Sequence, residues 1–352
     1  MQILRSKVDF IRLPLTSPLR TAAGKLTTFE TVILTLESAA AKGRAEAPIT
    51  VLPDADLPRL ADLLEHQIMP ILTNRSISDS NALREALGKW ARNPLIYAMT
   101  EMAWFDLLAA EKNQPLCRVL GGEPISQQVF TSLDEPENDA DGYPMANEFL
   151  DRVQKLYRAG YVHLELKVRP GWDVPMVRAV RQENPDASFH LDFEGALTTA
   201  NYDTIFQLRD FFPFMLEQAF APDQLCEHAE LQKMLVCPIC LDESVTSPGI
   251  VEAALKLGSV KTVKINPLRA GGFESAKEIL AICRDAGADC WISSPLATGV
   301  SVRACLAFSC LEGFTGPFES YDLLEHFAPD QLSGIEMPPA LTLDEEHSLR
   351  IE

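Results

Sequence analysis

The sequence lacks any apolar run of about 18 residues, the length at which a membrane span is suspected. Its most apolar helix-like stretch, residues 95–111, carries Glu101 and Asp106. The amino-terminal stretch has neither the apolar core nor the small-residue cleavage site of a secretory signal. We therefore expect a cytoplasmic protein with no membrane association.

Clusters of basic residues are missing as well. The chain has 31 Lys and Arg against 50 Asp and Glu, which gives a net charge of −19 at pH 7. Binding of nucleic acid needs a basic stripe or patch, so we expect no nucleic-acid partner. An acidic surface mainly disperses the protein in water, and it leaves a homo-oligomer open.

The sequence has few cysteine pairs at the spacing of zinc ligands or of a disulfide framework. Eight cysteines are scattered along the chain, and Cys237 and Cys240 form a CxxC without a second Cys/His pair. A chain of 352 residues buries a core large enough to need no disulfide. We interpret the cysteines as buried free thiols in a reducing compartment.

Two patterns divide the chain. The first 45 residues contain β-branched, alternating runs, and residues 55–112 contain apolar positions at helical spacing. From about residue 126, short apolar strands alternate with helix-like segments about eight times, which predicts a parallel α/β barrel. We place its eighth strand at residues 313–317, and the last 30 residues also have strand character.

Four of the predicted barrel strands end in an ionisable residue: Lys167, Asp192, Glu217 and Asp242. The carboxyl ends of parallel barrel strands meet at one mouth, where active sites form. The three acids are each one βα unit apart, so they lie on adjacent strands and repel one another. A hard divalent cation removes that cost, and all-oxygen ligation suits Mg²⁺, with Mn²⁺ as the alternative.

Several motifs around these residues are familiar, namely LELKVRPGWDV, LDFEGA, MLEQAFAPDQL, PICLDES and NPLRAGG. Together they resemble the enolase superfamily, and within it the muconate lactonising subgroup, in particular its o-succinylbenzoate synthases and N-acylamino acid racemases. The resemblance covers nearly the whole chain. It implies a modified TIM barrel, (β/α)7β, at residues 126–319, and an α+β capping domain at residues 1–125 that is completed by about 320–352.

The shared step of this superfamily is abstraction of a proton α to a carboxylate, supported by a divalent cation. The resemblance implies that Asp192, Glu217 and Asp242 are the metal ligands and that Lys167 is the general base. Glu243, directly after Asp242, and Glu165 are expected to be outer-shell residues. The partner is therefore expected to be a small-molecule carboxylate.

The sequence departs from the family pattern at two lysines. Glu165 stands where a lysine is usual, two residues before Lys167 on the same strand face. Asn266 stands where the sixth-strand lysine is usual, and an amide cannot transfer protons at a useful pKa. Lys264 lies one layer deeper on that face. It either reaches up to the site or remains in an ion pair with Glu165.

The predicted substrate contacts come from two places. Arg20 and Lys25, in the loop between the first two strands, are candidates for a distal carboxylate, with a solvated loop cation as the alternative. Ser293 and Ser294, at the end of the seventh barrel strand, offer hydroxyl or backbone donors.

Two histidines, His163 and His190, share strand faces with Lys167 and Asp192 but lie lower in the predicted barrel. We interpret both as barrel-core residues, with a catalytic role as the alternative.

A reaction that needs one base tolerates these departures best. We therefore expect a syn β-elimination of water of the o-succinylbenzoate synthase type, as used in menaquinone biosynthesis. The alternatives are an N-acylamino acid racemase or dipeptide epimerase, which would rest on Lys264, a muconate-type cycloisomerase, and a barrel that binds metal and ligand without turnover.

Overall fold

The computed structural model describes residues 1–21, 24–134, 146–169, 171 and 173–352. Its first sheet is antiparallel, with the strand order β1 (Arg5–Thr21), β2 (Gly24–Glu37) and β3 (Lys42–Pro48). Gly43 lets this sheet approach a helix closely, because an added Cβ there would collide with the backbone of Leu107. That helix, α4, is Pro94–Glu111.

Helices complete this amino-terminal region, as the sequence predicts. They are α1 (Leu57–Leu63), a π-helical turn (Leu64–Ile68), α2 (Met69–Leu72), α3 (Ser80–Leu87), a 3₁₀ turn (Gly88–Arg92), α4 and α5 (Leu116–Leu120). The side chain of Asn93 accepts a hydrogen bond from the backbone nitrogen of Ile96 and so begins α4. Within the described ranges, no helix is both long and apolar enough to cross a membrane.

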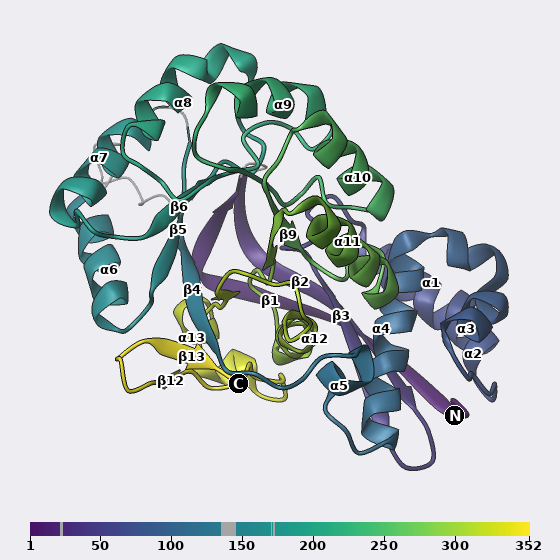
Figure 1. Cartoon of the computed structure of the whole chain (residues 1–352). Coiled ribbons are helices and arrows are strands. Elements are labelled where there is room, and N and C mark those ends of the chain that lie inside the picture. Colours follow the sequence, from purple (N-terminus) through teal and green to yellow (C-terminus); the bar gives the residue numbers. More distant parts are fainter. Residues whose placement is uncertain (22–23, 135–145, 170, 172) are drawn as a thin grey trace.

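A parallel barrel follows, built from strands paired in chain order (Figure 1). Its strands are β4 (Gln127–Leu133), β5 (His163–Lys167), β6 (Phe189–Asp192), β7 (Leu216–Glu217), β8 (Ile239–Leu241), β9 (Thr262–Ile265), β10 (Asp289–Ile292) and β11 (Phe318–Glu319). β11 pairs in parallel with β4, and a bridge between Cys290 and Phe314 closes the ring beside β10. The barrel is therefore closed by its first and last strands.

One helix lies in each connection between consecutive barrel strands. They are α6 (Ala146–Arg158), α7 (Asp173–Glu183), α8 (Tyr202–Arg209, after a 3₁₀ turn at Thr199–Asn201), α9 (Leu225–Met234), α10 (Pro248–Leu257), α11 (Phe273–Ala286) and α12 (Gly299–Ser309). In Figure 1, α6 to α10 form the outer arc, while β1 and β2 lie across the barrel. Eight parallel strands with seven helices between them, over the described residues, confirm the predicted (β/α)7β fold.

The eighth strand lies later than the sequence indicated. The prediction at residues 313–317 is wrong, because the strand is Phe318–Glu319. Pro317 has no backbone N–H for a ladder, and Gly316 lies so close to the Trp291 ring that a Cβ would collide with it.

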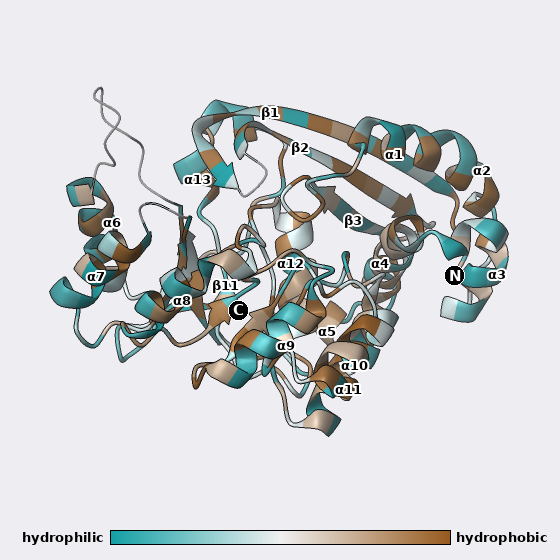
Figure 2. Ribbon diagram, turned by 90° about the horizontal axis from the view of Figure 1, so that it is seen from above, coloured by the Kyte–Doolittle hydropathy of each residue, from teal (hydrophilic) through white to brown (hydrophobic). Residues whose placement is uncertain are grey.

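The last residues contact both regions. Leu323 of α13 (Leu323–His326) and Phe327 pack with Leu15 and Phe29 of the first sheet, and a 3₁₀ turn follows at Pro329–Leu332. The hairpin of β12 (Thr342–Leu343) and β13 (Leu349–Ile351) pairs instead with β4 of the barrel. The domain limits at 125/126 and 319/320 therefore remain a proposal. In Figure 2, β1 and β2 run along one side of the molecule above the barrel helices.

Candidate active site

The carboxyl ends of β5 to β8 bring the four predicted residues to one mouth. Lys167, Asp192 and Glu217 are the last residues of their strands, and Asp242 follows β8 directly. Lys167 pairs in register with Asp192, and Asp192 with Glu217. All four line one cavity of about 610 Å³.

The other wall of this cavity comes from the amino-terminal region. Arg20 and Lys25 line it, together with residues 49–55 after β3. Nine Asp and Glu but only five Lys and Arg are among its lining residues. This excess of negative charge in a partly buried site favours a bound cation.

Lys167 is surrounded by carboxylates. Its Nζ lies 2.8 Å from Asp192 Oδ2, 2.9 Å from Glu194 Oε1 and 3.1 Å from Glu165 Oε1. Burial disfavours the ammonium, but these three carboxylates outweigh burial and hold the pKa of Lys167 well above its usual value. Burial also raises the pKa of Asp192 to about 7, with repulsion from Glu217 adding to it and Lys167 opposing it.

Lys264 lines the same cavity, but carboxylates hold its ammonium. Its ammonium is buried one layer below, 2.8 Å from Glu165 Oε2 and 2.9 Å from Glu217 Oε1, with Glu319 Oε2 at 3.7 Å. Burial opposes its charge, but these acids raise the pKa of Lys264 well above the usual value. The ammonium therefore stabilises a buried group of carboxylates.

The side chain of Asn266 forms hydrogen bonds within and beside its own turn. Its Nδ2 donates to the carbonyl of Ser293 (2.9 Å), and its Oδ1 accepts from the backbone nitrogens of Leu268 and Arg269 (3.0 and 3.2 Å). The side chain is 1% exposed. No proton donor or acceptor of useful pKa therefore occupies this position.

The seventh strand contributes one of the two predicted serines to the cavity. Ser293 lines the cavity and its Oγ accepts from Arg269 (3.2 Å), whereas the backbone nitrogen of Ser294 donates to Glu319 Oε2 (2.7 Å). Arg269 also donates to Asp242 Oδ1 (2.5 Å). This ion pair holds Asp242 toward β9.

A divalent cation fits the charges of this site. Ligand atoms of Glu165, His190 and Glu217 lie within 4.8 Å of one another, a buried group consistent with a divalent-metal site. The Lys264 ammonium already contacts both glutamates of that group. In the described part of the chain, Glu243 Oε2 is buried without a hydrogen-bond partner, whereas Glu217 Oε2 lies 2.9 Å from His190 Nε2. A buried carboxylate oxygen without a partner is what an oxygen-bound cation satisfies.

Glu243 is another acid of this cavity. It lines the cavity because β8 has ended at Leu241 and strand alternation no longer applies. Burial raises the pKa of Glu243 well above its usual value, and the neighbouring Asp242 and Asp192 carboxylates add to this. A cation beside these acids would relieve that repulsion.

Sequence reasoning missed several lining residues: Asp134, Glu194, Arg269, Glu319 and Tyr321. Asp134 and Glu319 follow the same rule as the predicted acids, since each stands at the carboxyl end of a barrel strand. Misplacement of the eighth strand concealed Glu319. Burial raises its pKa to about 8, with Lys264 opposing this and Glu165 adding to it.

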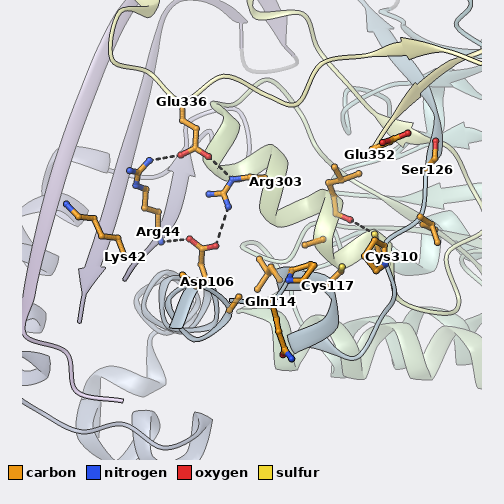
Figure 3. Close-up of a pocket in the computed structure, with 18 residues that line it drawn as sticks. Lys42, Arg44, Asp106, Gln114, Cys117, Ser126, Arg303, Cys310, Glu336 and Glu352 are labelled. Carbon is orange, nitrogen blue, oxygen red and sulfur yellow. Dashed lines mark hydrogen bonds and ion pairs between the residues drawn. The ribbon is translucent and has the colours of Figure 1, made fainter. Parts of the chain in front are cut away.

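A second cavity, of about 740 Å³, lies between β3, α4, α5 and α12 (Figure 3). Arg44 and Arg303 both bind Glu336 there, at 2.5 and 2.6 Å, and Arg303 also contacts Asp106 at 3.4 Å. This network joins the amino-terminal region to a barrel helix. None of the predicted site residues lines it.

Comparison with known proteins agrees with this fold. The Enolase C-terminal domain-like family model matches residues 148–334. The chain is 32% identical over 320 residues to the N-succinylamino acid racemase of Thermus thermophilus, covering 90% of this chain and 85% of that one. It is 33% identical over 255 residues to the o-succinylbenzoate synthase of Geobacillus kaustophilus, covering 72% and 66%. A crystal structure of an enolase-superfamily protein from Listeria innocua matches with a TM-score of 0.85 and 26% identity, covering all of this chain and 92% of that one.

An α/β barrel closed by its first strand, with an acidic mouth under an antiparallel sheet, defines a metal-dependent enzyme of the enolase type. The chain belongs to the enolase superfamily, in the muconate lactonising subgroup. Its relatives at about 30% identity divide between o-succinylbenzoate synthases and N-succinylamino acid racemases.

Proposed function

We propose that the chain is an o-succinylbenzoate synthase, a lyase that removes a proton α to a carboxylate and eliminates water, in menaquinone biosynthesis. One observation carries this proposal. Lys167 ends its strand inside the cavity, whereas Asn266 holds the place of a second base and is bound to its own turn. Because position 266 offers no acid–base side chain, we assign proton transfer to Lys167, which suits a reaction on one face of the substrate.

In this proposal Lys167, as the free amine, takes the α-proton. The resulting ammonium then donates a proton to the departing hydroxide on the same face, and water leaves. Asp192, Glu217 and Asp242 would hold Mg²⁺ or Mn²⁺, with Glu243 behind them. The cation would supply charge compensation for the substrate carboxylate and would favour the amine form of Lys167.

The far end of the substrate would meet the amino-terminal region. Arg20, Lys25 and Ser293 line the same cavity as Lys167, so we assign them to the distal carboxylate. Two cations and a hydroxyl suit a carboxylate, which accepts hydrogen bonds only.

N-Succinylamino acid racemase activity is the second candidate, favoured by the relative that covers 90% of this chain. It requires a second proton donor on the opposite face. Lys264 is the nearest amine on that strand, and it would have to leave Glu165 and Glu217.

The direct test uses 2-succinyl-6-hydroxy-2,4-cyclohexadiene-1-carboxylate and the Mg²⁺-loaded protein, with loss of the diene absorbance as the readout. We expect rapid loss that depends on Mg²⁺, persists in Lys256→Ala and disappears in Lys167→Ala. Lys256 is an exposed lysine paired with Glu252 on α10, so it serves as the matched control. Absence of any loss in the unmodified protein would contradict the synthase assignment.

A further inference from the structure

One buried carboxylate of the amino-terminal region takes no part in the proposed reaction. Glu46, on β3, is 1% exposed and lies outside the lining of the active-site cavity. Taking a carboxylate out of water is costly unless hydrogen bonds compensate it. The hydrogen-bond partners of Glu46 therefore indicate what this residue stabilises.

Glu46 joins the first sheet to a helix of the barrel. Its Oε1 accepts from the Thr31 hydroxyl of β2 (3.0 Å) and from the backbone nitrogen of Thr298 (3.1 Å). Its Oε2 accepts from the Thr298 hydroxyl (2.8 Å) and from the backbone nitrogen of Ser301 (2.9 Å). Burial raises the pKa of Glu46, and these hydrogen bonds oppose that rise. Both oxygens are thus bound to the start of α12.

The start of α12 needs such acceptors. A helix leaves its first backbone N–H groups without a partner inside the helix, and negative charge is favourable at that end. The backbone nitrogen of Val300 donates to the Thr298 hydroxyl oxygen (3.3 Å), and that of Ser301 donates to Glu46. Glu46 therefore supplies both an acceptor and a negative charge to this helix from another part of the fold.

The two segments that Glu46 joins both continue to the active-site cavity. Residues 49–55, directly after β3, line it. On the barrel side, Ser293 and Leu296 line it, and α12 follows shortly after them. The hydroxyl of Thr50 donates to the Leu296 carbonyl (2.6 Å), which adds a second bond between the segments at the cavity wall itself.

We propose that Glu46 is a positioning residue that fixes the distance between two walls of the cavity, residues 49–55 and residues 293–296. The inference rests on the proposed function, in which Ser293 helps to bind the distal carboxylate of the substrate. Glu46 does not touch the substrate and acts through the two segments that it joins. Its loss should weaken binding of the distal carboxylate more than it slows the chemistry at Lys167.

Glu101 provides a comparison within the same region. It is also fully buried, and it accepts from the backbone nitrogens of Phe273 (2.5 Å) and Glu274 (3.4 Å) at the start of α11. It lies on α4, however, and among the described residues none of α4 lines the active-site cavity. A buried carboxylate that only anchors a barrel helix should behave like Glu101.

Glu46→Gln is the variant that tests this position. Each oxygen of Glu46 accepts from one backbone N–H group, so the amide nitrogen of the variant faces an N–H donor whichever way the side chain turns. The substitution keeps the size of the side chain and weakens the junction. Glu101→Gln makes the same chemical change at the other junction and serves as the matched control.

The first test needs neither metal nor substrate. Hydrogen–deuterium exchange with mass spectrometry measures the protection of backbone amides in residues 49–55 and 293–301. We expect roughly tenfold faster exchange of both segments in Glu46→Gln, because a buried N–H group loses its acceptor. In Glu101→Gln we expect faster exchange at the start of α11 instead. Unchanged exchange of residues 49–55 in Glu46→Gln would overturn the proposal.

Thr31→Val makes a smaller change at the same carboxylate. It removes one donor to Glu46 on the side of the first sheet, keeps the shape of the side chain and leaves the contacts with α12 in place. We expect exchange of residues 49–55 to become about two- to threefold faster in this variant. If Glu46→Gln fails to fold, this variant decides, and unprotected segments no different from those of the unmodified protein would overturn the proposal.

The second test measures ligand binding by the Mg²⁺-loaded protein with titration calorimetry. 2-Succinylbenzoate carries the distal carboxylate, whereas 2-acetylbenzoate ends at the ketone and lacks it. We expect the unmodified protein to prefer 2-succinylbenzoate, Glu46→Gln to reduce this preference roughly fivefold or more, and Glu101→Gln to retain it. An equal preference in Glu46→Gln and the unmodified protein would overturn the proposal. Failure of the unmodified protein to bind either ligand would instead contradict the proposed function, while the exchange test would still decide the role of Glu46.

Discussion

The ends of β5 and β9 face each other across the barrel, since four strand positions separate them in the closed ring. β5 ends in Lys167, whose ammonium enters the cavity. After β9 comes Asn266, whose amide closes a turn, and the amine of Lys264 lies one layer lower among carboxylates. Charge is thus present on both sides, and the proposed function assigns proton exchange with substrate to the Lys167 side alone.

The largest effect should come from the β5 side. Lys167→Arg keeps the positive charge and the ion pairs but cannot act as a base, so we expect turnover to fall by at least about 10³-fold. Asn266→Ala removes only hydrogen bonds within a turn, and we expect turnover within about tenfold of the unmodified enzyme with a stability loss of roughly 1–3 kcal/mol. Loss of diene absorbance measures the turnover of each variant, and denaturant unfolding measures its stability. An equal loss of turnover in both variants would remove the contrast.

Lys264 should matter mainly for stability. Lys264→Met leaves Glu165, Glu217 and Glu319 without their shared cation, and we expect a loss of about 3–5 kcal/mol in unfolding free energy. Combining it with Glu165→Met removes one of the stranded charges, so the double variant should recover part of the loss. Equilibrium denaturation of the three proteins forms the cycle. A purely additive loss would show that the two residues do not act as a pair.

Glu101 is a buried carboxylate outside the active-site cavity, and it provides a comparison with the lysine-bound carboxylates of the site. Its carboxylate accepts hydrogen bonds from the backbone nitrogens of Phe273 and Glu274 at the start of α11. Burial raises its pKa from 4.5 to about 7, with those hydrogen bonds opposing the shift. Because the folded state holds this proton more tightly, unfolding free energy should fall by about 3 kcal/mol as the pH rises from 4.5 to 7. Glu101→Gln should lose this part of the pH dependence, and an unchanged profile would contradict it.

The smallest expected effect is stabilisation by the cation itself. Mg²⁺ at about 100 times its dissociation constant should add about 2.7 kcal/mol to the unfolding free energy. Glu217→Gln should abolish that gain, whereas Glu101→Gln should keep it. Calorimetry with and without Mg²⁺ measures the difference. A full gain in Glu217→Gln would place the cation elsewhere.

Spacing along the chain predicted much of the site. Lys167, Asp192 and Glu217 end consecutive parallel strands, so their convergence follows from barrel geometry alone. The (β/α)7β fold followed from the strand and helix pattern together with the family resemblance. Neither required knowledge of any long-range side-chain contact.

The remaining features depend on contacts that spacing does not encode. Glu319 was missed because Pro317 displaces the eighth strand by a few residues. The position of Lys264 depends on its contact with Glu165, 99 residues earlier in the chain, which sequence spacing does not reveal. The interpretation of His163 and His190 as core residues agrees with their burial, but it did not anticipate that His190 Nε2 contacts both Glu165 and Glu217.

The most direct test of a one-sided site is proton exchange with the two enantiomers of an N-succinylamino acid, each incubated with the Mg²⁺-loaded protein in D₂O. The account predicts that one enantiomer exchanges its α-proton with retention of configuration, that the other does not, and that Lys167→Arg abolishes the exchange. Interconversion of the enantiomers would contradict it, because racemisation requires a second proton donor on the side where Asn266 stands.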